Sequence, residues 1–117
     1  MIAVIFEAIP VLGKKEDYLG IAAQLRPGLD GIKGFISLER FQSINDPEKI
    51  LSLSFWEDEA AVSQWRNTEM HRHAQEQGRR SIFKDYRLRV ANVLRDYGMN
   101  NREAAPADSK HIHDQKQ

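Results

Sequence analysis

Cysteine is absent from the 117 residues of this chain. Without it there are no disulfide bonds, thiolate metal sites or cysteine nucleophiles, so any chemistry must use other groups. The sequence also lacks an apolar run near the roughly twenty residues that cross a bilayer. The apolar segment at residues 1–6 is short and has no basic region before it, which is typical of a first strand and not of a signal peptide. We therefore expect a soluble, cytoplasmic protein that does not enter a membrane.

Net charge is lacking as well, since 17 basic residues balance 17 acidic ones. No net field then attracts nucleic acid or an anionic membrane, and we expect neither as a partner. The sequence contains no nucleotide-binding loop or flavin fingerprint. Its length and its apolar fraction of 41% suit one compact domain.

The hydrophobic pattern predicts six elements in the order strand, helix, strand, strand, helix, strand. The strands are expected at residues 2–9, 35–42, 50–57 and about 84–97. The first helix follows Lys14, repeats apolar residues at helical spacing as far as Leu25, and is expected to break or kink at Pro27 and Gly28. Beyond Gly98 the chain is polar and has no apolar period. We therefore assign residues 1–97 to the domain and 98–117 to a flexible polar tail.

The second helix is expected to begin at residues 58–59, whose negative charges suit a helix N-terminus. Its apolar stripe includes Trp65, but the same spacing would next turn an acid inward. This conflict predicts a break near Asn67 and Thr68, either of which could cap a new helix. His71 is then expected on the solvated surface. Counted from the break, the inward face consists of Met70, His73, Ala74 and Gln77.

This order of elements matches a ferredoxin-like α+β fold, βαββαβ, with an antiparallel sheet and helices on one face. The first strand is apolar on both faces apart from Glu7, which indicates that the second face of the sheet is also covered. Two such sheets packed face to face would cover it. We therefore predict a homodimer in the form of a dimeric α+β barrel.

One motif narrows the choice of family. The third expected strand ends in a Trp followed by acidic residues, in the segment Ser54-Phe55-Trp56-Glu57-Asp58-Glu59-Ala60. Trp65 and a helix that bears His follow it. This arrangement resembles the antibiotic biosynthesis monooxygenase (ABM) family of dimeric barrels. The resemblance covers residues 1–97 and implies a homodimer with a pocket between the sheet and the helices. Known activities of the family include cofactor-independent oxidation of polycyclic phenols to quinones and oxidative cleavage of haem, and many members have no assigned substrate.

The haem-degrading members of that family use an Asn near the end of the first strand, a Trp on the second helix and a His further along it. Trp65 matches the Trp. At the Asn position this chain has Phe6 or Glu7, and at the His position, ten residues after Trp65, it has Gln75. Because two of the three residues are missing, we rank haem degradation below oxygenation of an organic substrate.

Several residues are candidates for a site. His73 could act as a base, because a His with a near-neutral pKa can take a phenolic proton, or it could be a buried structural His bonded to a backbone carbonyl. Glu7 is either a pocket acid with a raised pKa or, more commonly, one half of an ion pair with Arg40, Arg87 or Arg89. The residues expected to line a substrate pocket are Trp65, Phe6, Met70 and Gln77.

We expect no metal and no cofactor. His71 and His73 are two residues apart, so on a helix they point about 200° apart and cannot bind one metal ion together. The leading hypothesis is a cofactor-independent monooxygenase that acts on a small aromatic or quinol-type substrate. The alternatives are a haem-binding or haem-degrading monooxygenase, and a non-catalytic dimeric binding protein whose core would be filled.

Overall fold

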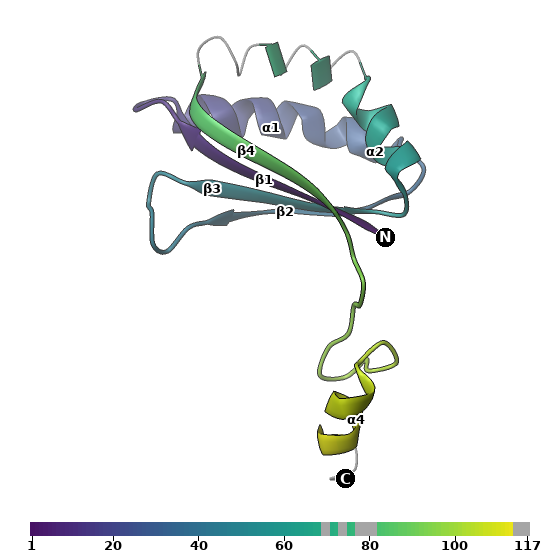
Figure 1. Ribbon diagram of the computed structural model, residues 1–117. Coiled ribbons are helices and arrows are strands. Elements are labelled where there is room, and N and C mark those ends of the chain that lie inside the picture. The colour runs from purple at the N-terminus through teal and green to yellow at the C-terminus, as the bar shows by residue number, and fades with distance from the viewer. Residues whose placement is uncertain (69–70, 73–74, 77–81, 114–117) are drawn as a thin grey trace.

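The computed structural model describes residues 1–68, 71–72, 75–76 and 82–113 of the chain. Its centre is a four-stranded antiparallel sheet with the strand order β2-β3-β1-β4 (Figure 1). The strands are β1 (Ile2–Pro10), β2 (Phe35–Gln42), β3 (Ile50–Trp56) and β4 (Phe83–Asn92). Helices α1 (Lys15–Leu29) and α2 (Glu59–Arg66) lie on the same face of the sheet (Figure 1). The predicted ferredoxin-like order βαββαβ is confirmed.

The sequence predicts a break or kink at Pro27, but helix α1 runs through this residue to Leu29. Proline lacks the N–H that would bond to the preceding turn, which disfavours it inside a helix. The last turn nevertheless holds because Leu29, only 2% exposed, packs in one cluster with Trp56 and Ala61. Burial of one leucine contributes about 1.5–3 kcal/mol, which offsets much of the cost of the proline.

Helix α2 begins and ends where its sequence predicts. The side chain of Asp58 accepts a hydrogen bond from the backbone N–H of Ala61 at 2.9 Å, which caps the first turn. The helix ends at Arg66, and the Thr68 hydroxyl then accepts a hydrogen bond from the His71 N–H at 3.3 Å. The break at Asn67 and Thr68, with Thr68 as the cap of a new turn, is confirmed.

Two hydrophobic clusters pack between the sheet and the helices, one at each end. At one end the cluster is Ala8, Tyr18, Ile50 and Ile82; at the other it is Leu29, Ile32, Trp56 and Ala61. Trp56 belongs to the second cluster. The side chain of Trp56 is 2% exposed and its ring meets that of Phe35 at 5.2 Å, because it stands on the face of β3 that the helices cover.

The opposite face of the sheet carries a second set of apolar side chains. Successive residues of a strand point to opposite faces, so Ile5 on β1 and its cross-strand partner Leu53 on β3 stand away from the helices, as do Leu51 and Phe55. No described helix lies over this face (Figure 1). A second copy of the chain as its cover stays a prediction.

Strand β4 ends at Asn92, five residues before the end that alternation predicted. Asn92 pairs with Ile2, and one further bond joins the Val93 N–H to the Met1 carbonyl at 3.0 Å. The predicted end at residue 97 was therefore wrong, because alternation of side chains does not by itself create the backbone pairing that a strand needs.

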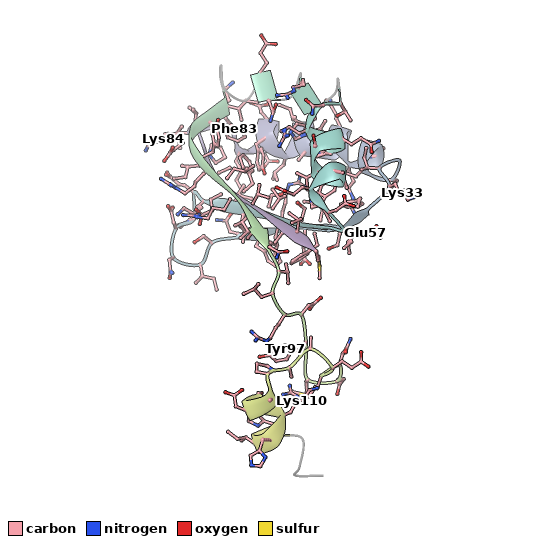
Figure 2. The ribbon with its side chains drawn as sticks, turned by 45° about the vertical axis from the view of Figure 1, so that its right-hand side comes forward. Lys33, Glu57, Phe83, Lys84, Tyr97 and Lys110 are labelled. Carbon is pink, nitrogen blue, oxygen red and sulfur yellow. The ribbon has the colours of Figure 1, made fainter. Side chains whose placement is uncertain are left out.

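The expected flexible tail contains regular structure. A short helix, α4 (Ala107–His113), lies well apart from α1 and α2, as do Tyr97 and Lys110 (Figure 2). Arg102 links this segment by donating hydrogen bonds to the Gly98 carbonyl at 3.3 Å and to the Ser109 hydroxyl at 3.0 Å. The flexibility of the tail and the domain boundary at residue 97 stay predictions. Within the residues that the structure describes, no helix is long and apolar enough to span a membrane.

Candidate active site

A cavity of about 280 Å³ lies between the sheet and the helices. Its walls are mostly apolar and come from every strand and both helices. On one side, α1 contributes Tyr18, Ile21, Ala22 and Leu25, which is the apolar stripe that the sequence predicted. On the other side, Tyr86, Leu88 and Val90 of β4 are 43–53% exposed, so this rim faces solvent. That this cavity is the substrate pocket implied by the family resemblance stays a prediction.

Trp65 forms part of the wall at the end of α2. Its ring approaches α1 at Gly28, where an added Cβ would lie only 3.3 Å from the Trp65 Cζ3 atom. Glycine at this position therefore lets the indole pack directly on the backbone of α1. Trp65 and Phe6 both line the cavity, where the sequence placed them. Their part in binding a substrate stays a prediction.

His71 lines the cavity, and our expectation that it is a solvated surface residue was wrong. Its ring meets the Trp65 ring edge to face, with centroids 5.1 Å apart. The break itself was predicted, but the direction that the chain takes after it was not. The new turn begins at its Thr68 cap and carries His71 against Trp65. Helical spacing counted from the break cannot give that direction, because it depends on how the new turn packs against α2.

The imidazole of His71 is held in its neutral form. Its Nδ1 atom is buried and has no hydrogen-bond partner among the described residues. Burial lowers the pKa of His71 below its ordinary value of 6.5, and the positive charges of Arg72 and Arg66 lower it further. At neutral pH the ring is therefore uncharged and retains a free lone pair.

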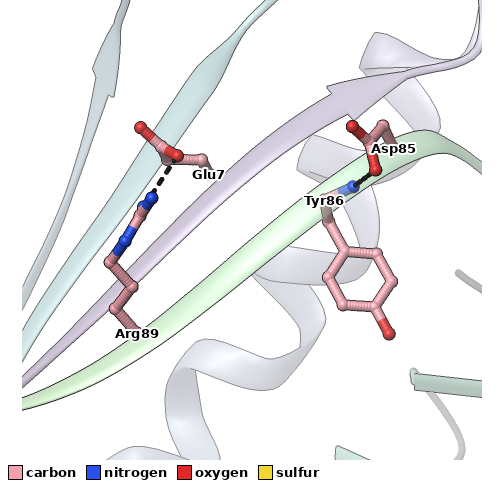
Figure 3. A network of polar contacts seen from close by, with 4 residues as sticks. All are labelled: Glu7, Asp85, Tyr86 and Arg89. Carbon is pink, nitrogen blue, oxygen red and sulfur yellow. Dashed lines mark hydrogen bonds and ion pairs between the residues drawn. The ribbon is translucent and has the colours of Figure 1, made fainter.

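Glu7 lies on the other face of the sheet. Its carboxylate accepts a hydrogen bond from the Arg89 guanidinium at 3.0 Å, whereas Tyr86 of the neighbouring strand lies on the cavity side (Figure 3). Of the two interpretations of Glu7, ion pairing is the one observed, with Arg89 as the partner. Because Phe6 and Glu7 are neighbours on β1, their side chains point to opposite faces of the sheet, so only one of them can reach the cavity.

Three of the predicted site residues, His73, Met70 and Gln77, fall outside the described residues. Gln75, at the position where haem-degrading relatives keep a His, does line the cavity and accepts a hydrogen bond from Arg72 at 3.3 Å. Within the described part of the chain, no three potential metal ligands come together.

Sequence analysis missed the cavity's cationic side chains, Arg26, Arg40 and Arg66. The position of Arg40 in the cavity could have been inferred from the alternation of β2. Arg40 shares a strand face with Leu38, and a register shift between Phe35 and Ser37 leaves that face toward the helices. Ser52 and Ser54 of β3 stand on the same side, and the Ser54 hydroxyl accepts a hydrogen bond from the Trp56 indole N–H at 2.9 Å.

Comparison with known proteins agrees with this geometry. The family model described as "Antibiotic biosynthesis monooxygenase" matches residues 1–77, which is most of the fold and of the cavity wall. The chain belongs to the ABM family.

A curated relative of this ABM protein is longer than the chain. The curated "Jasmonate monooxygenase ABM" of Pyricularia oryzae is 50% identical over 93 residues, which is 80% of this chain but only 43% of the relative. The chain therefore spans less than half the length of that relative.

Solved structures support the fold. A protein from Shewanella oneidensis has a TM-score of 0.71 at 19% identity, over 77% of this chain and 87% of the other. A structure titled antibiotic biosynthesis monooxygenase has a TM-score of 0.68 at 16% identity, over 80% of this chain and 98% of the other. At such identities the likeness establishes the ABM fold and leaves activity to be argued from the site.

Proposed function

We propose that this ABM protein is a cofactor-independent monooxygenase that acts on a small aromatic or quinol-type substrate in the cavity between the sheet and the helices. One observation carries the proposal: an uncharged, partly buried His71 faces Trp65 inside an apolar cavity, and its Nδ1 has no partner among the described residues. A flat ring can stack on the indole while the imidazole removes a proton from it.

The chemistry on this route balances without an added reductant. His71 takes a proton from the substrate, and the resulting anion gives an electron to O₂. The two radicals then combine to form a carbon–oxygen bond. When the O–O bond breaks, one oxygen atom stays as a carbonyl and the other leaves as water, so that R₂CH₂ and O₂ become R₂C=O and H₂O. The protein's part is to deprotonate the substrate and to exclude bulk water.

Oxygen uptake tests the proposal. The panel contains phenols, quinols and, because the Pyricularia relative is named for it, jasmonate. His71→Gln should lower kcat on any accepted substrate by about 100-fold or more while changing KM little, since loss of a general base typically costs that much. His113→Gln, an exposed change in α4, is the matched control and should leave kcat unchanged. Turnover that survives His71→Gln would remove this residue from the mechanism.

Haem is the second candidate, because the structure brings a His into the cavity. His71 would be the residue to hold the iron. The fit is poor, because the remaining positions carry Phe6 or Glu7 and Gln75. The cavity of about 280 Å³ is also smaller than most small-molecule sites, which span roughly 300–1,000 Å³. Titration with hemin should therefore give no saturable Soret band. A saturable band that is lost in His71→Ala and kept in His113→Ala would make haem binding the leading candidate function.

The third candidate is a non-catalytic dimeric binding protein, for which we expected a filled core. The cavity counts against it. Binding of a panel compound without any oxygen uptake would return it to first place.

A further inference from the structure

The charged side chains that the structure describes on the cavity wall are arginines. Among the described residues that line it, Arg26, Arg40 and Arg66 are present and no Asp or Glu is found. The sequence as a whole is neutral, so this excess belongs to the cavity and not to the composition. An apolar cavity with cationic groups favours a ligand that is apolar over most of its surface and negative at one point.

The three arginines differ in how they are used. The Arg26 guanidinium is exposed and stacks over the Phe35 ring at 5.5 Å, and exposed Arg66 reaches the Ser63 hydroxyl at 3.5 Å. Arg40 is partly buried on β2, and its Nε is buried without a hydrogen-bond partner among the described residues. A buried charged donor left unpaired is costly, so Arg40 is the cation that would gain most from an anionic ligand.

Arg40 does not stand alone on the cavity floor. Its cross-strand partner is Ser52, and Ser54 follows two residues later on the same face of β3. The Ser54 hydroxyl already accepts the Trp56 N–H bond, which leaves its own hydrogen free to donate. We call Arg40, Ser52 and Ser54 the polar strip. It offers donors to one small acceptor group within otherwise apolar walls.

We propose that the cavity binds its substrate as a carboxylate, with the acid group on the polar strip and the apolar remainder against Trp65 and β4. The inference rests on the proposed function only in taking this cavity as the substrate site. A guanidinium matches a carboxylate with two parallel hydrogen bonds, a geometry that neutral isosteres of the acid do not reproduce.

A matched pair of probes tests the charge. Hydrocinnamic acid and hydrocinnamamide have the same shape, and only the acid is ionised at neutral pH. Isothermal titration calorimetry should show the acid binding about tenfold or more tightly than the amide, as expected for a charge-assisted pair. Arg40→Gln should remove this preference and leave the affinity for the amide unchanged.

The control is Arg87→Gln, which removes the same charge from an exposed side chain on the other face of the sheet. It should leave both affinities unchanged. Equal affinity for acid and amide in the parent protein, no binding of either probe, or equal effects of the two substitutions would overturn the inference. The ratio in the parent decides the matter even where Arg40→Gln does not fold.

Oxygen uptake separates the two proposals. Preference for the acid without turnover on any panel compound supports the carboxylate site and contradicts the oxygenase. Turnover on neutral quinols without preference for the acid supports the oxygenase and contradicts the carboxylate site.

Discussion

At the scale of single residues, the site depends on where the helix breaks. Helix α2 ends at Arg66, Thr68 caps the turn that follows, and that turn brings His71 against Trp65. The pairing gives the imidazole an apolar, partly buried setting, which disfavours its charged form. The proton acceptor that the proposed chemistry needs therefore follows from a local interruption of helical periodicity.

The lowered pKa of His71 predicts a pH dependence of stability. Between the folded pKa and 6.5, the unfolded chain binds more protons than the folded one, so stability rises with pH across this window. The contribution is complete above pH 6.5 and is lost as the pH falls toward and below the folded value. Urea unfolding of His71→Gln should lack this part of the acid destabilisation, and His113→Gln should keep it. Identical profiles for the two variants would contradict the prediction.

At the scale of elements, the connection from α1 into β2 holds α2 in place. Gly34 in this connection has φ +94°, and an added Cβ would lie 2.9 Å from the Ala61 Cβ at the start of α2. The Gly34 carbonyl also accepts a hydrogen bond from the Glu57 N–H at 2.8 Å. Glycine is required here both for the backbone conformation and for the close approach of α2.

Gly34→Ala should therefore destabilise the protein by about 1–3 kcal/mol. Gly20→Ala is the control. Gly20 lies inside α1 with no atom within 4 Å of an added Cβ, and alanine there should stabilise the helix by about 0.5–1 kcal/mol. Chemical unfolding measures both changes. Equal signs for the two substitutions would show that the strain at Gly34 is absent.

At the scale of the whole molecule, one sheet face packs on helices and the other presents Ile5, Leu51, Leu53 and Phe55 without a described helix over it. We propose that a second copy of the chain covers this face, as the apolar pattern of β1 predicts. The two cavities of such a dimer would lie on its outer sides, beneath the helices.

Leu53→Asp should convert the dimer to a monomer, because it places a carboxylate among the apolar side chains of this face, beside Ile5 and opposite Glu39. Leu12→Asp is the control, since Leu12 is 92% exposed and lies outside the sheet. Light scattering at micromolar concentration gives the mass of each variant, and circular dichroism checks that it folds. A monomeric parent protein would contradict the dimeric barrel outright.

Residue patterns predicted most of the helices and strands of the fold. Alternation predicted β2 at residues 35–42, as observed, and acidic residues with a later Asn-Thr pair located the start and end of α2. The errors came from contacts that lie outside local sequence. Pro27 stays helical because Leu29 is buried beyond it, and β4 pairs with β1 only as far as Asn92 although the alternation of its side chains continues.

The sequence by itself determined the order of elements, the apolar stripe of α1 and the position of Trp65 on α2, because periodicity and caps act over a few residues. The family was indicated by resemblance, through the motif at residues 54–60 and Trp65. Only the tertiary structure decided that His71 and Arg40 face the cavity and that Glu7 pairs with Arg89. Those outcomes depend on strand register and on the path of the chain after α2. Both are settled by packing between segments far apart in the sequence.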